Sequence, residues 1–161
     1  MEKESVIIGL GLFFLFMGPI LYIIFKQSAK DRSRLKHLKK ICSEHNMDPT
    51  QFEISNTLLL GLDEKAKKMV VLEPQNEMKY EVIALEELDR SQISKKTFTE
   101  PHSKKSKDRV VHVSLDLIWN HGANKTRDII FYDEEDNDSL DPEARLFIAQ
   151  KWDRMIRANI A

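Results

Sequence analysis

An uncharged run of twenty residues, from Val6 to Phe25, constrains this chain more than any other feature. A helix of that length spans about 30 Å, the thickness of the hydrocarbon core of a bilayer. The run lacks the polar face that a helix on the surface of a soluble domain would carry. We therefore predict a transmembrane helix over residues 6–25, preceded by a short extracytoplasmic tail of residues 1–5.

A cleaved signal peptide is the alternative interpretation of this run. Such a peptide has an apolar region of about 7–15 residues and small residues before the cleavage site. The apolar run here is longer, and Gln27 would occupy the −3 position if the chain were cut after Ala29. The pattern favours an anchor that stays. Pro19 removes a helix hydrogen bond and predicts a kink at Gly18-Pro19, either as a hinge or as a tolerated irregularity.

A dense basic segment follows the apolar run. Residues 26–40 hold seven basic residues against Asp31, whereas Lys3 is offset by Glu2 and Glu4 on the other side. Positive charge is retained on the cytoplasmic side, so we expect the remainder of the chain in the cytoplasm and the N-terminus outside. The predicted juxtamembrane lipid contacts are Lys26, Lys30, Arg32, Arg34, Lys36, Lys39 and Lys40.

Residues 26–47 are predicted to form a basic juxtamembrane helix. Leu35, Leu38, Ile41 and Cys42 recur at helical spacing and make one narrow apolar stripe. Two interpretations stay open: the helix lies against anionic lipid, or it continues the membrane helix as a rigid stalk. Cys42 is the only cysteine, which excludes an intramolecular disulfide and fits a reducing compartment.

From residue 48 the pattern changes to short alternating strands separated by polar turns. A C-terminal helix follows, with Asp141 as its N-cap and Pro142 at its first position. Ile148, Trp152 and Ile156 form a stripe that can bury against a sheet. We predict one α+β cytoplasmic domain over residues 48–161, with six antiparallel strands at 52–62, 68–72, 80–85, 93–98, 109–120 and 127–133.

The order of these elements carries a resemblance. The segments LLLGLDEKAKKMVVL, VIALEELDRSQI, VVHVSLDLIW, DIIFYDEED and ARLFIAQKWDRMI together look like a pleckstrin-homology-like domain. That resemblance implies a bent antiparallel sheet or partly open barrel closed by a C-terminal helix. It has seven strands where the pattern gives six, so it requires either a division of 52–62 or one further strand. The whole chain also resembles small single-pass membrane proteins of unknown function from Bacteroidota-type bacteria. A lipocalin-like or split-barrel fold stays open.

No pattern of residues indicates catalysis. The acidic stretch DEEDNDSLD at 133–141 lacks the glycine and the spaced glutamate of a calcium loop. His112 and Asp116 share a strand face but are too far apart along it for a direct pair. We expect no enzyme activity, no cofactor, no metal site and no nucleic-acid partner.

The basic stretch 95–109 is the best candidate site in the domain. It holds six basic residues against Glu100 and Asp108, and pleckstrin-homology-like domains often present basic loops to phosphorylated headgroups or peptides. A mobile solvated loop is the alternative. The candidate contacts with a lipid or a protein partner are Lys95, Lys96, Lys104, Lys105, Lys107 and Arg109.

These features predict a single-pass protein of the inner (cytoplasmic) membrane of a bacterium. Its cytoplasmic domain would act as a protein-interaction or scaffolding module with a protein partner not yet known. The alternative is a reader of anionic lipid headgroups through residues 95–109, and an enzyme with an unrecognised site is the remote third hypothesis.

Overall fold

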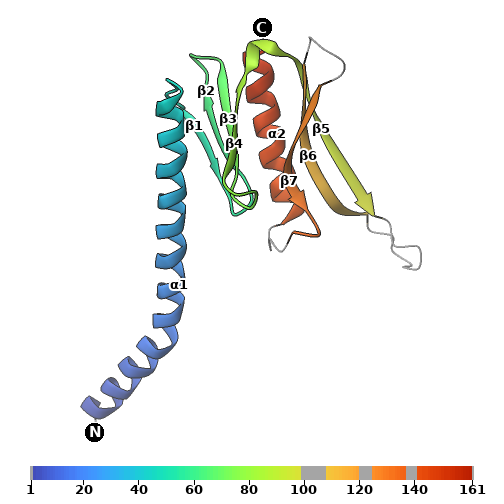
Figure 1. The fold of residues 1–161 in the computed structure, drawn as a ribbon. Coiled ribbons are helices and arrows are strands. Elements are labelled where there is room, and N and C mark those ends of the chain that lie inside the picture. The colour runs from blue at the N-terminus through green and yellow to red at the C-terminus, as the bar shows by residue number, and fades with distance from the viewer. Residues whose placement is uncertain (1, 99–107, 120–124, 137–140, 161) are drawn as a thin grey trace.

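The computed structural model describes residues 2–98, 108–119, 125–136 and 141–160, with the backbone alone for residues 2–12 and 14. One long helix leads into a domain of two antiparallel sheets and a C-terminal helix (Figure 1). The elements are α1 (Glu2–Glu44), β1 (Gln51–Ile54), β2 (Leu59–Asp63), β3 (Lys68–Glu73), β4 (Lys79–Ala84), the 3-10 turn η1 (Leu85–Glu87), β5 (Leu88–Phe98), β6 (Arg109–Trp119), β7 (Thr126–Asp133) and α2 (Pro142–Asn159).

α1 is a single helix of 43 residues, so the two helices predicted over 6–25 and 26–47 are continuous. Figure 1 shows its axis changing direction in the N-terminal half, which contains Pro19. It ends where Asn46 takes a positive φ of 55°, and Met47 N–H donates to the Cys42 carbonyl at 2.8 Å. Such a left-handed residue is a usual way to stop a helix and satisfy its last carbonyls. Across the residues whose side chains are described, no helix is long and apolar enough to cross a membrane.

The first sheet has the order β1-β2-β3-β4. The single strand predicted over 52–62 is wrong, because a tight turn divides it into β1 and β2. Ser55 makes that turn: its hydroxyl accepts from Leu58 N–H at 2.9 Å, and its own N–H donates to the Leu58 carbonyl at 2.8 Å. Every residue of β2 is buried, so both faces of this sheet are covered.

The second sheet has the order β5-β6-β7. β5 begins at Leu88, five residues before the predicted start, because Leu88 and Ser91 are buried and pair with the far end of β6. The prediction of one six-stranded meander is therefore corrected to seven strands in two sheets. The extra strand comes from the division of 52–62.

α2 confirms the helix predicted at the C-terminus. The Asp141 carboxylate accepts from Glu143 N–H at 3.1 Å, which satisfies one of the free donors of the first turn. Trp152 and Ile156 are buried, and Ile148 and Met155 pack partly against the same core. α2 lies on the second sheet and contacts all three of its strands.

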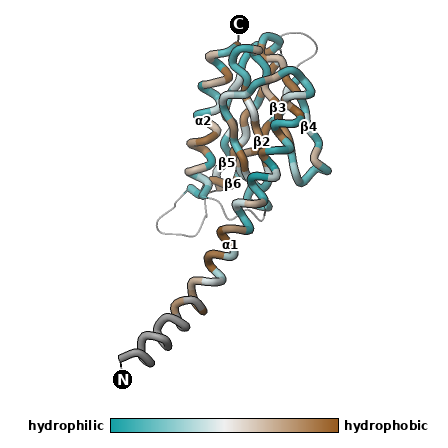
Figure 2. Tube along the Cα trace, turned by 90° about the vertical axis from the view of Figure 1, so that its left-hand side faces the viewer, coloured by the Kyte–Doolittle hydropathy of each residue, from teal (hydrophilic) through white to brown (hydrophobic). Residues whose placement is uncertain are grey.

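Two apolar cores result from this arrangement. The larger one lies between the two sheets and α2, and Trp152 is its largest fully buried side chain. The smaller one lies on the opposite face of the first sheet, between that sheet and the C-terminal end of α1. Figure 2 shows the apolar strand residues gathered inside the domain, whereas apolar residues of α1 also occur outside it.

Candidate interaction surfaces

The C-terminal half of α1 is docked on the first sheet. Leu38, Ile41 and Cys42 are fully or almost fully buried, and they pack with Leu59 and Val70 of β2 and β3. Burial also raises the pKa of the Cys42 thiol, so the neutral thiol is favoured there. The apolar stripe seen in the sequence therefore contacts the chain's own sheet, which neither the lipid-surface nor the free-stalk interpretation had included.

Arg34 fixes this docking through polar contacts. Its guanidinium donates to the Ser55 carbonyl at 3.0 Å and to the Asn56 side-chain oxygen at 2.8 Å. A further bond reaches the Asn56 carbonyl at 3.4 Å, and Asp31 lies 3.9 Å away. Arg34 was predicted to contact lipid, but its donors bind the turn between β1 and β2.

The other basic residues of α1 divide into two groups. Lys39 Nζ lies 5.5 Å from the centre of the Phe52 ring, and Lys40 Nζ lies 3.8 Å from a Glu44 carboxylate oxygen. The second group is exposed and pairs with no carboxylate among the described residues. Its members are Lys26, Lys30, Arg32 and Lys36.

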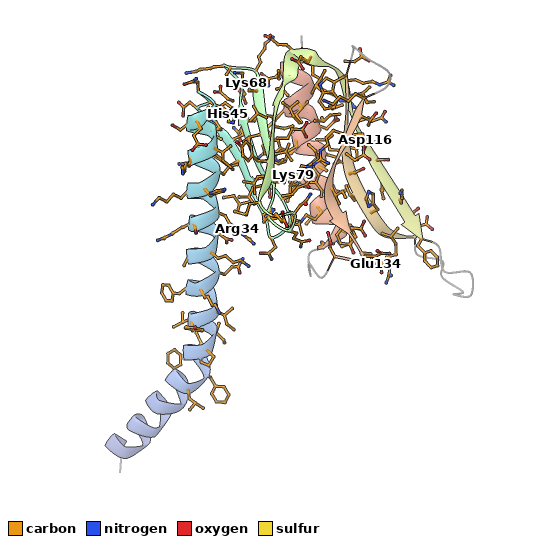
Figure 3. All side chains as sticks on the ribbon, in the orientation of Figure 1. Arg34, His45, Lys68, Lys79, Asp116 and Glu134 are labelled. Carbon is orange, nitrogen blue, oxygen red and sulfur yellow. The ribbon has the colours of Figure 1, made fainter. Side chains whose placement is uncertain are left out.

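The basic stretch 95–109 is described only in part. Lys104, Lys105 and Lys107 lie outside the described residues, while Lys95 and Lys96 are exposed near the end of β5. Arg109 begins β6 and forms an ion pair with Glu134. Figure 3 places Glu134 at the same end of the domain as Arg34, whereas His45 lies at the other end. Arg34 of α1 and the described ends of the basic stretch therefore lie toward the same end of the domain, the end from which the N-terminal half of α1 projects.

A histidine–carboxylate pair lies beside this basic stretch. His112 Nδ1 is 2.9 Å from an Asp133 carboxylate oxygen on the neighbouring strand. The Glu135 N–H and then His112 lower the pKa of Asp133. The carboxylate beside His112 therefore belongs to Asp133 on the neighbouring strand and not to Asp116. Asp116 accepts from the Ser114 hydroxyl at 2.8 Å.

A second polar cluster fastens α2 to the two sheets. Asp153 accepts from the Ser91 hydroxyl at 2.6 Å and from Arg157 Nε at 3.0 Å. Arg145 lies 3.8 Å from a Glu53 carboxylate oxygen. Burial raises the pKa of Glu53, and the charge of Arg145 opposes that rise. These contacts hold α2 against both sheets.

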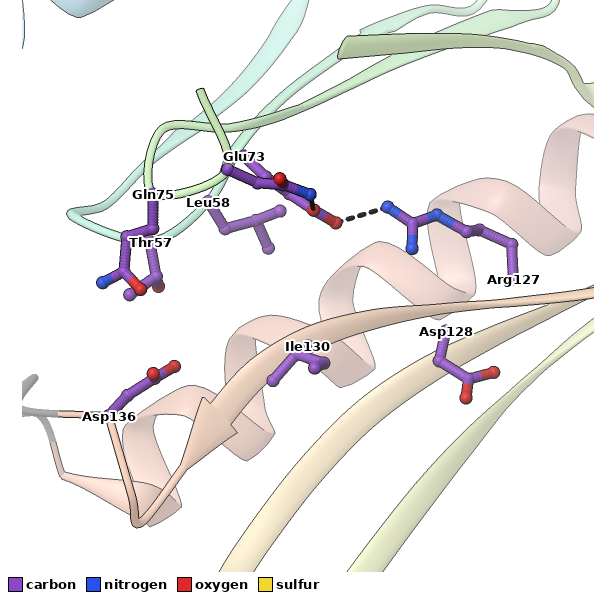
Figure 4. A pocket seen from close by; sticks show the side chains of 9 residues that line it. Thr57, Leu58, Glu73, Gln75, Arg127, Asp128, Ile130 and Asp136 are labelled. Carbon is purple, nitrogen blue, oxygen red and sulfur yellow. Dashed lines mark hydrogen bonds and ion pairs between the residues drawn. The ribbon is translucent and has the colours of Figure 1, made fainter. Parts of the chain in front are cut away.

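A pocket of about 390 Å³ lies between the first sheet and β7. Arg127 of β7 forms an ion pair with Glu73 at the end of β3, and its Nε is 3.3 Å from a Glu81 carboxylate oxygen on β4. Figure 4 shows Glu73 and Arg127 facing each other, with Asp128 on the β7 side. The lining residues are Thr57, Leu58, Glu73, Gln75, Asn76, Arg127, Asp128, Ile130 and Asp136.

Little in the order of residues indicates this pocket. Arg127 sits in a strand with ordinary alternation, and its carboxylate partners are 54 and 46 positions away in the chain. The spacing of residues along the chain does not predict contacts between residues on two separate sheets. An arginine among the buried-facing positions of a predicted strand was the one available signal, because a charged residue there needs a partner.

The described residues contain no group of three or more histidine, cysteine, aspartate or glutamate side chains placed to hold a metal ion. The chain matches no family model, and comparisons with curated proteins and with solved structures give no match. The surfaces of the domain and the two halves of α1 are therefore the features that bear on function.

Proposed function

We propose that this chain is a single-pass membrane protein whose cytoplasmic domain is a non-catalytic protein-interaction module. The observation that carries the proposal is the division of α1. Its C-terminal half is docked on the first sheet, and its N-terminal half presents large apolar side chains to the outside. The exposed residues are Phe13, Leu15, Phe16, Ile20, Leu21, Tyr22, Ile23, Ile24 and Phe25.

Such a surface is costly in water, and a bilayer is the environment that removes this cost. Val6 to Phe25 carries no charge and is long enough to cross the hydrocarbon core. The basic residues from Lys26 onward favour retention of the domain in the cytoplasm and the N-terminus outside. We place the protein in the inner membrane of a bacterium on this basis.

The proposed domain type is pleckstrin-homology-like. Support comes from the four-stranded and three-stranded antiparallel sheets and from the C-terminal helix that packs on the second sheet. The division of 52–62 into β1 and β2 brings the strand count to the seven that the resemblance requires. Folds of this kind host many functions, so the interaction role is argued from the anchor and the surfaces.

Contact with anionic lipid is the second candidate function. The exposed cations Lys26 and Lys30 follow the apolar half of α1, at the level of the headgroups of the proposed membrane, and Arg32 and Lys36 lie further along on the exposed side of the docked half. Each basic residue near an anionic surface contributes about 1 kcal/mol to binding. Residues 95–109 would add to this contact through Lys95 and Lys96, while Arg109 is already neutralised by Glu134.

Affinity purification of the full chain from membranes of its own cell tests the proposed function. The matched control is a chain that ends after Glu44 and so keeps α1 without the domain. Proteins recovered with the full chain and missing from the control support an interaction module. Identical recoveries from both, under cross-linking, contradict it.

Lipid contact is tested separately with vesicles that carry the full chain. A fluorescent probe on the domain should report closer approach to the bilayer when about a third of the lipid is anionic, and salt should reverse the effect. Replacement of Lys26, Lys30, Arg32 and Lys36 by glutamine should abolish the response. A response that survives this replacement excludes α1 as the lipid contact.

A further inference from the structure

We propose that the pocket beside β7 binds an extended segment of a partner protein that carries a lysine or arginine side chain. This inference depends on the proposed interaction function and names the chemistry of the partner. Three features of the pocket point to this occupant: its charge, its position along the edge of β7 and the apolar side chains around it.

The charge of the pocket is negative once its internal ion pairs are counted. Arg127 is held between Glu73 and Glu81, so its positive charge is already matched by two carboxylates of the first sheet. Asp128 and Asp136 also line the pocket, and neither forms an ion pair with a cation among the described residues. A ligand with a positive charge is the occupant that these two carboxylates would attract.

The pocket follows the edge of β7 and does not lie on one face of its sheet. Successive residues of a strand point to opposite faces, yet Arg127 and Asp128 both line the pocket. Arg127 is paired with the core residue Leu117, and Asp128 with Asp116 on the other face. Among the described strands, β7 pairs only with β6, so its other edge is left without a neighbour.

An unpaired edge presents backbone N–H and C=O groups that an extended peptide can bind. Ile130 on β7 is an exposed large side chain at this edge, and Leu58 forms an apolar part of the pocket wall. An extended segment would therefore find backbone partners along β7, apolar contacts at alternate positions and carboxylates for one basic side chain. The volume of about 390 Å³ lies within the range of small-ligand sites.

The test uses the full chain in a non-ionic detergent and four heptapeptide pools. The central residue of each pool is fixed as Arg, Lys, Gln or Glu, and the other positions are mixed. We expect the Arg and Lys pools to be retained at least about fivefold more than the Glu pool, because each carboxylate contributes up to about 1 kcal/mol. Equal retention of all four pools would overturn the inference.

Two charge-matched double variants separate the pocket from general charge. Asp128→Asn with Asp136→Asn should weaken binding of the Arg pool about tenfold. Glu87→Gln with Asp89→Asn removes the same charge from exposed positions at the start of the second sheet and should leave binding unchanged. Equal losses in both double variants would mean attraction to net charge and would reject the pocket.

The strand-like binding has its own control. An Arg pool with N-methyl groups on the backbone nitrogens that flank the central residue cannot form the same ladder and should bind several-fold more weakly. Unchanged binding would reject addition along β7. A partner that copurifies equally with the wild type and with the Asp128→Asn, Asp136→Asn variant would also reject this inference, while the proposed interaction function would stand.

Discussion

The two halves of α1 belong to one continuous helix and yet have opposite relations to their surroundings. The N-terminal half is apolar and presents side chains such as Phe16, 69% exposed, to the outside. The C-terminal half is mostly polar and still buries Leu38 completely against the first sheet. The half of α1 that packs on the domain is therefore not the more hydrophobic half. It is the half whose narrow apolar stripe faces an apolar surface of the first sheet.

This difference has a consequence for the orientation of the domain. A helix docked over several turns transmits the direction of its own axis to the sheet on which it packs. If the N-terminal half sits in a bilayer, the same end of the domain faces the membrane in every molecule. Substitutions in each half of α1 should therefore have different effects.

Charges placed in the apolar half should remove the protein from membranes. Phe16→Lys with Ile20→Lys puts two cations into the proposed anchor, each at a cost of about 3 kcal/mol near the bilayer centre. We expect the protein to move from the membrane pellet to the supernatant after alkaline extraction. Ser33→Lys with His37→Lys adds the same charge at the same spacing on exposed positions of the docked half, and it should stay in the pellet.

Truncation of Leu38 should destabilise the domain by about 3 kcal/mol, because a fully buried leucine leaves a cavity when it is shortened. Denaturant titration of the full chain in detergent measures this change, since both tryptophans, Trp119 and Trp152, lie in the domain. Leu21→Ala, in the exposed half of the same helix, should change the free energy of unfolding of the domain by less than about 0.5 kcal/mol. Equal effects of the two variants would contradict the docked arrangement.

Loss of the Arg34 side chain should cost about 1–2 kcal/mol, because two good hydrogen bonds to the turn between β1 and β2 disappear. Arg32→Ala is the matched control, two positions away on the exposed side of the helix, and should have almost no effect on unfolding. A loss in the control as large as in Arg34→Ala would show that net charge, and not the turn contact, stabilises the docking.

The smallest effect is a pH dependence at the point where α1 leads into the sheet. The Asp63 carboxylate accepts from the N–H groups of Ala66, Asp48 and Lys65, and these bonds lower its pKa below the ordinary 3.8. A lowered folded-state pKa contributes stability that is present above the unfolded value and is lost as the pH falls through the folded one. Denaturant titrations from pH 6 down to about pH 2 should therefore show a steeper loss for the wild type than for Asp63→Asn.

Glu53 provides a control of opposite sign for that measurement. Burial raises its pKa above the ordinary 4.5, so its contribution is present below the unfolded value and is lost as the pH rises through the folded one. Glu53→Gln should remove a small loss of stability between acidic and neutral pH. The same slope in both variants would contradict the assignment of the two carboxylates.

Much of the secondary structure could be predicted because its signals are local. The cap at Asp141 set the start of the C-terminal helix where it is observed, and the stripe of Ile148, Trp152 and Ile156 indicated its buried face. The strands β3, β4, β6 and β7 follow from alternation and from the turns between them. Alternation alone predicted one strand over 52–62, because Ser55 to Leu58 contains neither glycine nor proline and the turn is made by the Ser55 side chain; only the strand count of the resemblance pointed to a division there.

The candidate sites were less predictable than the helices and strands. The basic positions on α1 were found from charge alone, but charge does not distinguish Arg34, which binds the domain, from Arg32, which is exposed. The pocket beside β7 depends on Arg127 meeting Glu73 across two sheets. The sequence does not indicate this ion pair, because the packing of the two sheets sets the distance between Arg127 and Glu73.

Local patterns are enough to predict the uncharged run, the continuous helical pattern after it and the alternation of most strands, since each arises from interactions between residues a few positions apart. Tertiary contacts are needed to establish that the stripe of Leu38 and Ile41 packs on the chain's own sheet, that the strands divide into two sheets and that carboxylates gather beside β7. Those outcomes depend on which apolar faces cover one another, and contacts between distant segments make that choice.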